Sequence, residues 1–341
     1  MDHRDLVELF TANYRLCEIG PGQSVAVLSE GGQLRDYAEA SLEAVRGLGA
    51  RAIDVNIPSD GAMDASQRIA NIGQNPLSQH PDAMQACKEA DMVIDHMLLL
   101  FSREQIEMQA AGSRVLLVVE PVEILQRLFP TAALRQRVEA GERRLAGAGR
   151  LRFVNAAGTD ITYRLDGKSI LTEYGFTATP GRWDHWPGGF LATLAADGGV
   201  AGRVVMDRGD LLFPQKKALS EPVEFVIRDG WVREINGGRE AAELRAFIES
   251  YDDPRAYAVS HIGWGLNEGC RWDPDLPGIG MDGRAHYGNV LFSLGPDTEF
   301  GGSNDTPCHL DLPMRNCNLW LDDDLIVEDG DVVPADMRPA A

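Results

Sequence analysis

Positive charge, long apolar runs and paired cysteines are all scarce in this sequence. It carries 32 lysine and arginine residues against 52 aspartate and glutamate residues, for a net charge of -20. Such an excess of negative charge repels nucleic acid and anionic lipid, so we expect no nucleic acid and no membrane partner. No apolar run approaches the length that spans a bilayer, and residues 1–5 lack the features of a signal peptide. The five cysteines include no CxxC pair, a pattern typical of reduced thiols, so we expect a cytoplasmic protein.

Several familiar catalytic motifs are also missing. The sequence contains no P-loop, no HExxH and no GxSxG, which argues against a kinase, a zincin-type protease and a serine hydrolase. One stretch, 278–283, matches the dinucleotide-binding pattern GxGxxG. It follows a proline-rich loop instead of a strand and begins no convincing helix, so we expect no dinucleotide site there.

The hydrophobic pattern of the first part of the chain alternates between helix and strand. Apolar residues at helical spacing indicate helices over 6–16, 35–48 and 82–90, and Ser102 is placed to cap another. Short apolar runs indicate buried strands at 24–28, 52–57, 92–95 and 115–119. Short strands separated by helices predict an open, mostly parallel α/β sheet.

The rest of the chain follows a different pattern. Asp229-Gly230, between apolar runs at 223–228 and 231–235, is a strong signal for a tight hairpin. Further strands are predicted at 151–154, 160–165, 318–321 and 325–327, and one clear helix at 239–250. We therefore expect an α/β domain over 1–150 and a mainly antiparallel α+β domain over 151–341.

A histidine and an aspartate two residues apart, His309 and Asp311, form the first candidate site. In a strand, residues at this spacing project from the same face, so both side chains can reach one metal ion. Among seven histidines in so acidic a chain, about one such triplet is expected by chance, and similar ones begin at His3 and His80. Those two lie at the terminus and beside a proline, whereas only His309 is followed by strand-like residues. A third ligand from elsewhere would complete two histidines and one carboxylate.

Three other residues are candidates on their surroundings. His261 lies among glycines that keep the backbone open beside an inward-facing imidazole, although a buried core histidine is the commoner explanation. His185 lies in a predicted loop, 181–189, that also carries a cation, an acid and two indoles, a density typical of a functional site. Glu173 could orient a ligand, but an ordinary acid at the end of a strand is the simpler interpretation.

These segments resemble the 2,5-dihydroxypyridine 5,6-dioxygenases of bacterial nicotinate degradation. The resemblance covers nearly the whole chain and is most specific in the run Pro-Gly-Arg-Trp-Asp-His-Trp-Pro at 180–187. It also includes 24–28, 172–175, 260–266, 287–289, 291–293 and 306–316. It implies an Fe(2+)-dependent enzyme that opens the C5–C6 bond of 2,5-dihydroxypyridine with dioxygen and yields N-formylmaleamate.

The same resemblance implies roles for individual residues. It implies that the iron is held in the second domain by His261, His309 and Asp311. It places Glu173 and His185 close to the metal as catalytic groups. An imidazole such as His185 can accept a hydroxyl proton and return it near neutral pH.

Four residues are expected to bind the substrate. The resemblance places Ser293 beside it, and Leu100 and Phe101 would shape a flat apolar slot for the ring. Arg182 could counter negative charge that develops on oxygen, although a structural salt bridge explains it equally well. Members of the family carry a histidine where this chain has Phe101. A phenylalanine cannot carry protons, so either His185 suffices or the preferred ring differs.

Metal-dependent leucyl aminopeptidases, which are similar in architecture, provide the alternative function. Those enzymes use two metals. An acidic ligand of theirs corresponds to His261 here and a histidine to Leu291, so the resemblance implies a single metal ion in this chain. The shared architecture also implies a homo-oligomer.

Overall fold

The computed structural model describes residues 2–59, 65–167 and 169–340. They form two compact units, each made of three stretches of chain. The first contains Met1–Pro130, Glu173–Gly188 and Pro277–Ile279, and the second contains Thr131–Thr172, Gly189–Leu276 and Gly280–Ala341. The domain boundary expected near residue 150 stays a prediction. No described helix is long and apolar enough to cross a membrane.

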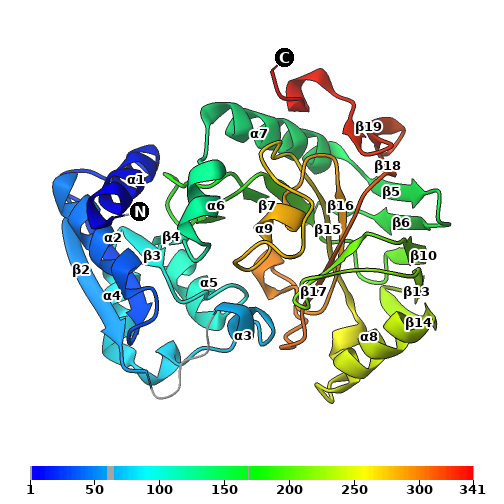
Figure 1. Cartoon of the computed structure of the whole chain (residues 1–341), viewed down its shortest axis with the longest axis horizontal. Helices are drawn as coiled ribbons and strands as arrows, with labels where there is room; N and C mark the ends of the chain where they lie inside the picture. The colour runs from blue at the N-terminus through cyan, green and yellow to red at the C-terminus, as the bar shows by residue number, and fades with distance from the viewer. Residues whose placement is uncertain (1, 60–64, 168, 341) are drawn as a thin grey trace. The chain divides into compact units, whose positions relative to one another are not determined.

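The first unit is built on a five-stranded parallel sheet in the order β2-β1-β3-β4-β8, and Figure 1 labels β2, β3 and β4 of this sheet. Its strands are β1 (Ser24–Glu30), β2 (Arg51–Ile57), β3 (Met92–Asp95), β4 (Arg114–Leu117) and β8 (Trp183–His185). Every pairing between neighbours is parallel. All residues of β1, β3 and β4 are buried, which explains the apolar runs that form most of each strand. The parallel α/β fold predicted for the first part of the chain is confirmed.

Helices precede the first of these parallel strands and lie in the segments between them. They are α1 (His3–Leu16), α2 (Arg35–Gly47), α3 (Ala65–Ile69), α4 (Pro81–Glu89), α5 (Arg103–Ala110) and α6 (Val122–Arg127), with a 3₁₀ turn at Leu77–Gln79. The cap predicted at Ser102 is present, because its side chain accepts the backbone N–H of Gln105 at the start of α5.

The second unit contains two antiparallel sheets and a short ribbon. The larger sheet has the order β14-β13-β10-β6-β5-β18-β19-β20. Its strands are β5 (Arg150–Asn155), β6 (Asp160–Arg164), β10 (Val200–Met206), β13 (Val223–Arg228), β14 (Trp231–Gly237), β18 (Cys317–Leu321), β19 (Asp324–Glu328) and β20 (Asp331–Val332). Asp229 and Gly230 turn the β13–β14 hairpin with φ of 54° and 77°, as their sequence predicts.

The smaller sheet carries the candidate site and has the order β17-β16-β15-β9-β7. Its strands are β7 (Ile170–Glu173), β9 (Phe190–Thr193), β15 (Val259–Gly265), β16 (Val290–Leu294) and β17 (Leu310–Met314). The ring of Phe292 on β16 meets that of Phe225 on β13 edge to face, with centroids 5.6 Å apart, so the two sheets share a core.

Shorter elements complete the second unit. The ribbon pairs β11 (Leu211–Leu212) with β12 (Lys217–Ala218). The helices are α7 (Ala132–Gly147), α8 (Arg239–Glu249) and α9 (Met281–Arg284), with 3₁₀ turns at Pro254–Tyr257, Thr298–Phe300 and Ala335–Met337. The expectation that this part is mainly antiparallel is confirmed by its strand pairings.

Candidate metal centre

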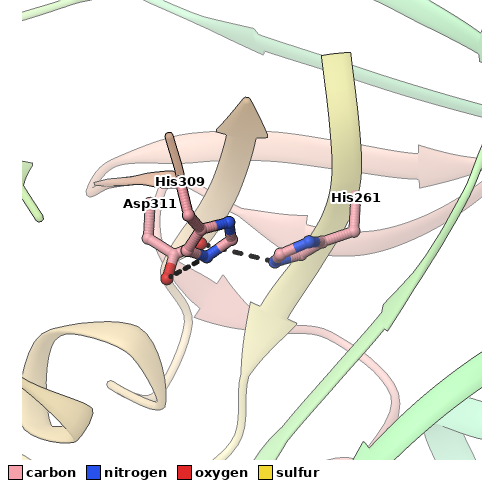
Figure 2. Close-up of side chains that lie close together, drawn as sticks. All are labelled: His261, His309 and Asp311. Atoms are coloured by element: carbon pink, nitrogen blue, oxygen red, sulfur yellow. Dashed lines mark ion pairs between the residues drawn. The ribbon is translucent and has the colours of Figure 1, made fainter. Parts of the chain in front are cut away.

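The smaller sheet brings together the side chains of His261, His309 and Asp311 (Figure 2). One potential ligand atom from each lies within 4.8 Å of the others. All three residues are buried, with exposed fractions of 4%, 3% and 4%. Among the described residues, no other group of three or more histidine, cysteine or acidic side chains gathers in this way.

The strand register explains how the three side chains meet. His309 immediately precedes β17 and Asp311 is its second residue, so the two side chains project from the same face. Asp311 is paired with Ser293 of β16, the strand that lies between β17 and β15. His261 reaches the same level of the sheet from β15. Sequence spacing predicted the meeting of His309 and Asp311, but the third member depends on strand order.

Asp311 is the charged centre of this group. Its Oδ2 lies 3.1 Å from Nε2 of His309 and 2.5 Å from Nε of Arg284, and its Oδ1 lies 3.4 Å from Nε2 of His261. Burial by itself would raise the pKa of Asp311, but His309, Arg284 and His261 together hold that pKa well below its ordinary value. The carboxylate is therefore ionised and ready to bind a cation.

Arg284 is a member of the site that sequence reasoning missed. It is the last residue of α9, it is 7% exposed, and its guanidinium lies over the ring of Phe213, 4.5 Å from the centroid. Phe213 is fixed in turn by two backbone hydrogen bonds with Asp311, of 3.0 and 3.1 Å. The sequence does mark this region, because the glycine-rich stretch 278–283 leads directly into Arg284. No dinucleotide site explains these glycines in our interpretation.

Glycines let Phe213 and Arg284 approach each other. Gly280 has a φ of 98°, and a Cβ there would lie 2.2 Å from a ring carbon of Phe213. A Cβ on Gly283 would lie 2.8 Å from the same ring. The aromatic ring therefore packs directly on the backbone that carries Arg284.

Aromatic rings surround the imidazole of His261. The ring of Phe300 stacks on it, with centroids 5.1 Å apart and an angle of 21°, and Phe190 meets it edge-on at 6.3 Å. Burial lowers the pKa of His261, in spite of the opposing effect of Asp311. The imidazole is therefore neutral near pH 7, the form that binds metal ions.

Of the expected substrate residues, Ser293 belongs to the same sheet. Its hydroxyl is fully buried and donates to the backbone carbonyl of Leu310 at 2.9 Å. Leu100, Phe101, Arg182 and His185 belong to the first unit. Glu173 is the last residue of β7 and also belongs to the first unit, whereas the rest of that strand belongs to the second. Their roles at the site stay predictions.

The prediction that His185 lies in a loop is wrong. His185 ends β8, which pairs with β4 in the parallel sheet, with Leu117 as its partner. The neighbouring Asp184 is fully buried and accepts the backbone N–H groups of Tyr174, Gly175 and His185 at 2.8 to 3.0 Å. The polar residues of this segment indicated a loop when the sequence was considered locally, whereas the strand is stabilised by pairing with residues 68 positions earlier in the chain (185 − 117).

Arg182 and Phe101 are both held within the first unit. Arg182 donates to Asp184 at 2.5 Å, and its guanidinium lies 4.1 Å above the ring of Tyr174. Phe101 is 6% exposed and has a φ of 61°. It follows a turn in which Asp95 accepts the backbone N–H groups of Met97 and Leu99.

Chemically, two imidazoles and one carboxylate suit a single divalent metal ion. This donor set on one side of a metal is typical of mononuclear iron sites that keep positions open for other ligands. The buried carboxylate needs a counter-charge, which Arg284 supplies through its ion pair with Oδ2, while Oδ1 faces His261.

The chain is similar over its whole length to proteins of one enzymatic class. Residues 5–334 match the family model described as 2,5-dihydroxypyridine 5,6-dioxygenase. The 2,5-dihydroxypyridine 5,6-dioxygenase of Pseudomonas putida is 39% identical over 340 residues, which cover 98% of this chain and 97% of that protein. A solved structure of 2,5-dihydroxypyridine dioxygenase from Pseudomonas putida KT2440 has a TM-score of 0.93 at 40% identity, and the match covers 99% of this chain and 100% of that one.

A more distant solved structure shares the fold. Wild-type AmpT from Thermus thermophilus has a TM-score of 0.64 at 16% identity, with 97% of this chain and 99% of that chain covered. Identity at that level shows the fold alone.

Proposed function

This chain belongs to the 2,5-dihydroxypyridine 5,6-dioxygenase family, and from this membership we propose that it cleaves the C5–C6 bond of 2,5-dihydroxypyridine. One molecule of dioxygen is consumed for each ring, and both oxygen atoms enter the product, N-formylmaleamate. The observation that carries the proposal is the buried group of His261, His309 and Asp311 in a chain that is 39% identical to such an enzyme.

The three side chains fit ferrous iron as the metal ion. His261 supplies a neutral imidazole, and Asp311 supplies a carboxylate that stays ionised although it is buried. When bound, Fe(2+) supplies the one-electron chemistry through which dioxygen and an electron-rich ring react. We propose that Nε2 of His261, Nε2 of His309 and one carboxylate oxygen of Asp311 are its ligands.

Other residues of the second unit would hold the metal ligands in place. Arg284 fixes Asp311 by its short ion pair, and Phe213 supports the guanidinium from the other side. Phe300 and Phe190 pack against His261 and keep water from its ring. A site that is dry and fixed in shape makes electrostatic interactions within it stronger.

Proton transfer in this proposal is carried out by His185. Its side chain is 2% exposed, and its position at the end of a parallel strand is a usual place for functional groups in α/β sheets. The imidazole would accept the proton of a ring hydroxyl as the ring reacts and return a proton as the C5–C6 bond opens. Glu173, a buried carboxylate, would orient an imidazole or a water molecule.

We further propose that Leu100, Phe101, Arg182 and Ser293 bind the substrate. Phe101 and Leu100 offer the apolar surface that a flat ring needs, and Ser293 lies beside Asp311 in the sheet register. Arg182 would act through its charge, which Asp184 holds in one orientation. The five cysteines are buried and form no disulfide with one another, which supports a cytoplasmic location. We also expect a homo-oligomer, which light scattering on the purified protein would measure.

The test uses protein purified without oxygen and loaded with Fe(2+). An oxygen electrode should record one O₂ consumed per 2,5-dihydroxypyridine, while the ultraviolet absorption of the ring disappears at the same rate. Protein loaded with Zn(2+) is the matched control and should consume no oxygen. Metal analysis should give one iron per chain. Failure of the iron-loaded protein to consume oxygen with any dihydroxypyridine, or equal turnover with zinc, would overturn the proposal.

A further inference from the structure

Strand β15 is irregular at His261, one of the three proposed metal ligands. Val259 of β15 pairs with Leu294 of β16, and Ile262 pairs with Phe292. Three steps along β15 (262 − 259) therefore match only two along β16 (294 − 292), so β15 contains one extra residue, a β-bulge. Ser260 and His261 together face the single residue Ser293.

The bulge changes the direction of one side chain. In a regular strand, Ser260 and His261 would project from opposite faces of the sheet. Here the two side chains touch, with Oγ of Ser260 3.2 Å from Nδ1 of His261. Both residues are buried, at 2% and 4% exposed. A bulge commonly re-aims a side chain in this way beside a functional site.

A second contact of Ser260 determines which ring nitrogen of His261 carries the imidazole proton. The Ser260 hydroxyl donates to the backbone carbonyl of Pro296, and a carbonyl can only accept. A serine hydroxyl has one proton, so its oxygen can only accept a hydrogen bond from His261. Nδ1 of His261 therefore carries the imidazole proton, and Nε2 presents its lone pair. Nε2 is the nitrogen that lies 3.4 Å from Oδ1 of Asp311.

The carbonyl of Pro296 is itself held in place. The backbone N–H of Gly295 donates to the carbonyl of Ala258 at 3.0 Å, and the side-chain amide of Asn304 donates to the carbonyl of Gly295 at 2.6 Å. The first bond attaches the segment after β16 to the residue that precedes β15, and the second attaches the same segment to Asn304. The acceptor for Ser260 is thus part of a fixed backbone turn.

We infer that Ser260 is a positioning residue that selects the metal-binding tautomer of His261 and holds its ring, through the bulge and the carbonyl of Pro296. The inference rests on the proposed function, because it takes His261 to be a metal ligand. Phe300 stacks on one face of the imidazole, and the hydrogen bond between Nδ1 and Ser260 restricts rotation of the ring about its Cβ–Cγ bond. Partners of this kind typically change metal affinity by about 10- to 100-fold.

The first test needs no substitution. Long-range ¹H–¹⁵N correlation spectra of the metal-free full chain distinguish the two neutral tautomers of a histidine, and His261→Asn identifies the signal. We expect His261 with its proton on Nδ1. A proton on Nε2 would overturn the inference, whatever metal the protein binds.

The second test compares Ser260→Ala with Ser113→Ala. Ser113 is a matched control, since its hydroxyl is also buried and donates to a backbone carbonyl in the first unit, that of Ala90 at 2.8 Å. Anaerobic titration with Fe(2+) against a competing chelator measures affinity. We expect Ser260→Ala to bind one iron about 10- to 100-fold more weakly and Ser113→Ala to match the wild-type protein.

The two possible failures can be told apart. If wild-type protein binds one iron and Ser260→Ala binds it equally well, the positioning role is wrong and the metal site stands. If wild-type protein binds no iron, or His261→Asn binds it unchanged, the proposed metal site is wrong and the role of Ser260 is overturned with it. A folded Ser260→Ala protein, checked by circular dichroism, is the condition for this comparison, and the tautomer measurement does not depend on it.

Discussion

Replacement of Arg284 by methionine tests the ion pair at the centre of the site. The substitution removes the charge and retains most of the length, so Asp311 loses its shortest contact, at 2.5 Å. Both side chains are nearly buried, at 8% and 5% exposed. For charge centres about 4 Å apart at an effective dielectric constant of about 20, the attraction is about 4 kcal/mol. This agrees with the loss of about 3–5 kcal/mol that follows removal of one partner of a buried pair.

The expected loss depends on the metal. In metal-free protein, Arg284→Met should lower the free energy of unfolding by about 3–5 kcal/mol, because Asp311 becomes a buried charge with too little compensation. In iron-loaded protein the bound cation compensates Asp311, so we expect less than half of that loss. Urea denaturation of both forms under nitrogen, followed by circular dichroism, measures the difference.

A control and two contrary outcomes make this test decisive. Arg137→Met removes another buried arginine of the same unit, whose partner Glu268 is half exposed and lies outside the metal centre, so its loss should be equal in both forms. Equal losses in both forms for Arg284→Met would mean that Arg284 acts by packing on Phe213. No loss in either form would mean that the pair with Asp311 contributes nothing to stability.

The other predictions concern the metal ligands, proton transfer, pH and packing. His309→Ala should lose iron and turnover while the circular dichroism spectrum stays unchanged; retained iron with full activity would refute the ligand assignment. His185→Ala should keep stoichiometric iron with kcat lower by about two to four orders of magnitude, and an unchanged rate would exclude it from proton transfer. Burial alone would raise the pKa of Glu240, but Lys217 and two backbone N–H groups lower it from 4.5 to about 2. The ionised Glu240 side chain therefore contributes fully to stability above pH 4.5, and this contribution is lost as the pH falls toward about 2. The urea midpoints of the wild type and Glu240→Gln should converge over that pH range. A constant difference between the two midpoints would contradict the lowered pKa. Gly280→Ala should cost about 1–3 kcal/mol in urea unfolding, because its Cβ would lie 2.2 Å from the Phe213 ring, and an unchanged midpoint would show that the ring moves freely.

The sequence predicted features that depend on neighbouring residues. The apolar run at 24–28 became the fully buried β1, and Asp229-Gly230 became a turn with two positive φ angles. The spacing of His309 and Asp311 correctly predicted that both side chains reach one point. In each case the information lies within a few residues, where periodicity and turn chemistry act.

Features that depend on distant residues could not be read in the same way. Strand β8 exists because β4 offers an unpaired edge, and the residues 183–185 have no strand pattern of their own. The bulge at Ser260 and His261 is defined only by the register with β16. Arg284 meets Asp311 because a short helix ends beside β17. The glycines at 278–283 mark this stretch of the sequence, but they do not identify Asp311 as the partner of Arg284. Which strand lies beside which is decided by the whole chain, since pairing over long separations carries a large entropic cost that only complete packing offsets.

The late position of β8 in the chain has a consequence for synthesis on the ribosome. Its first residue, Trp183, is added 66 residues after Leu117, the last residue of β4 (183 − 117). At roughly 5–20 residues per second, the growing protein spends roughly 3–13 seconds with one edge of its first sheet open. An open edge can pair with another nascent chain, so slow translation of this interval, or a truncation within it, should favour aggregation over folding.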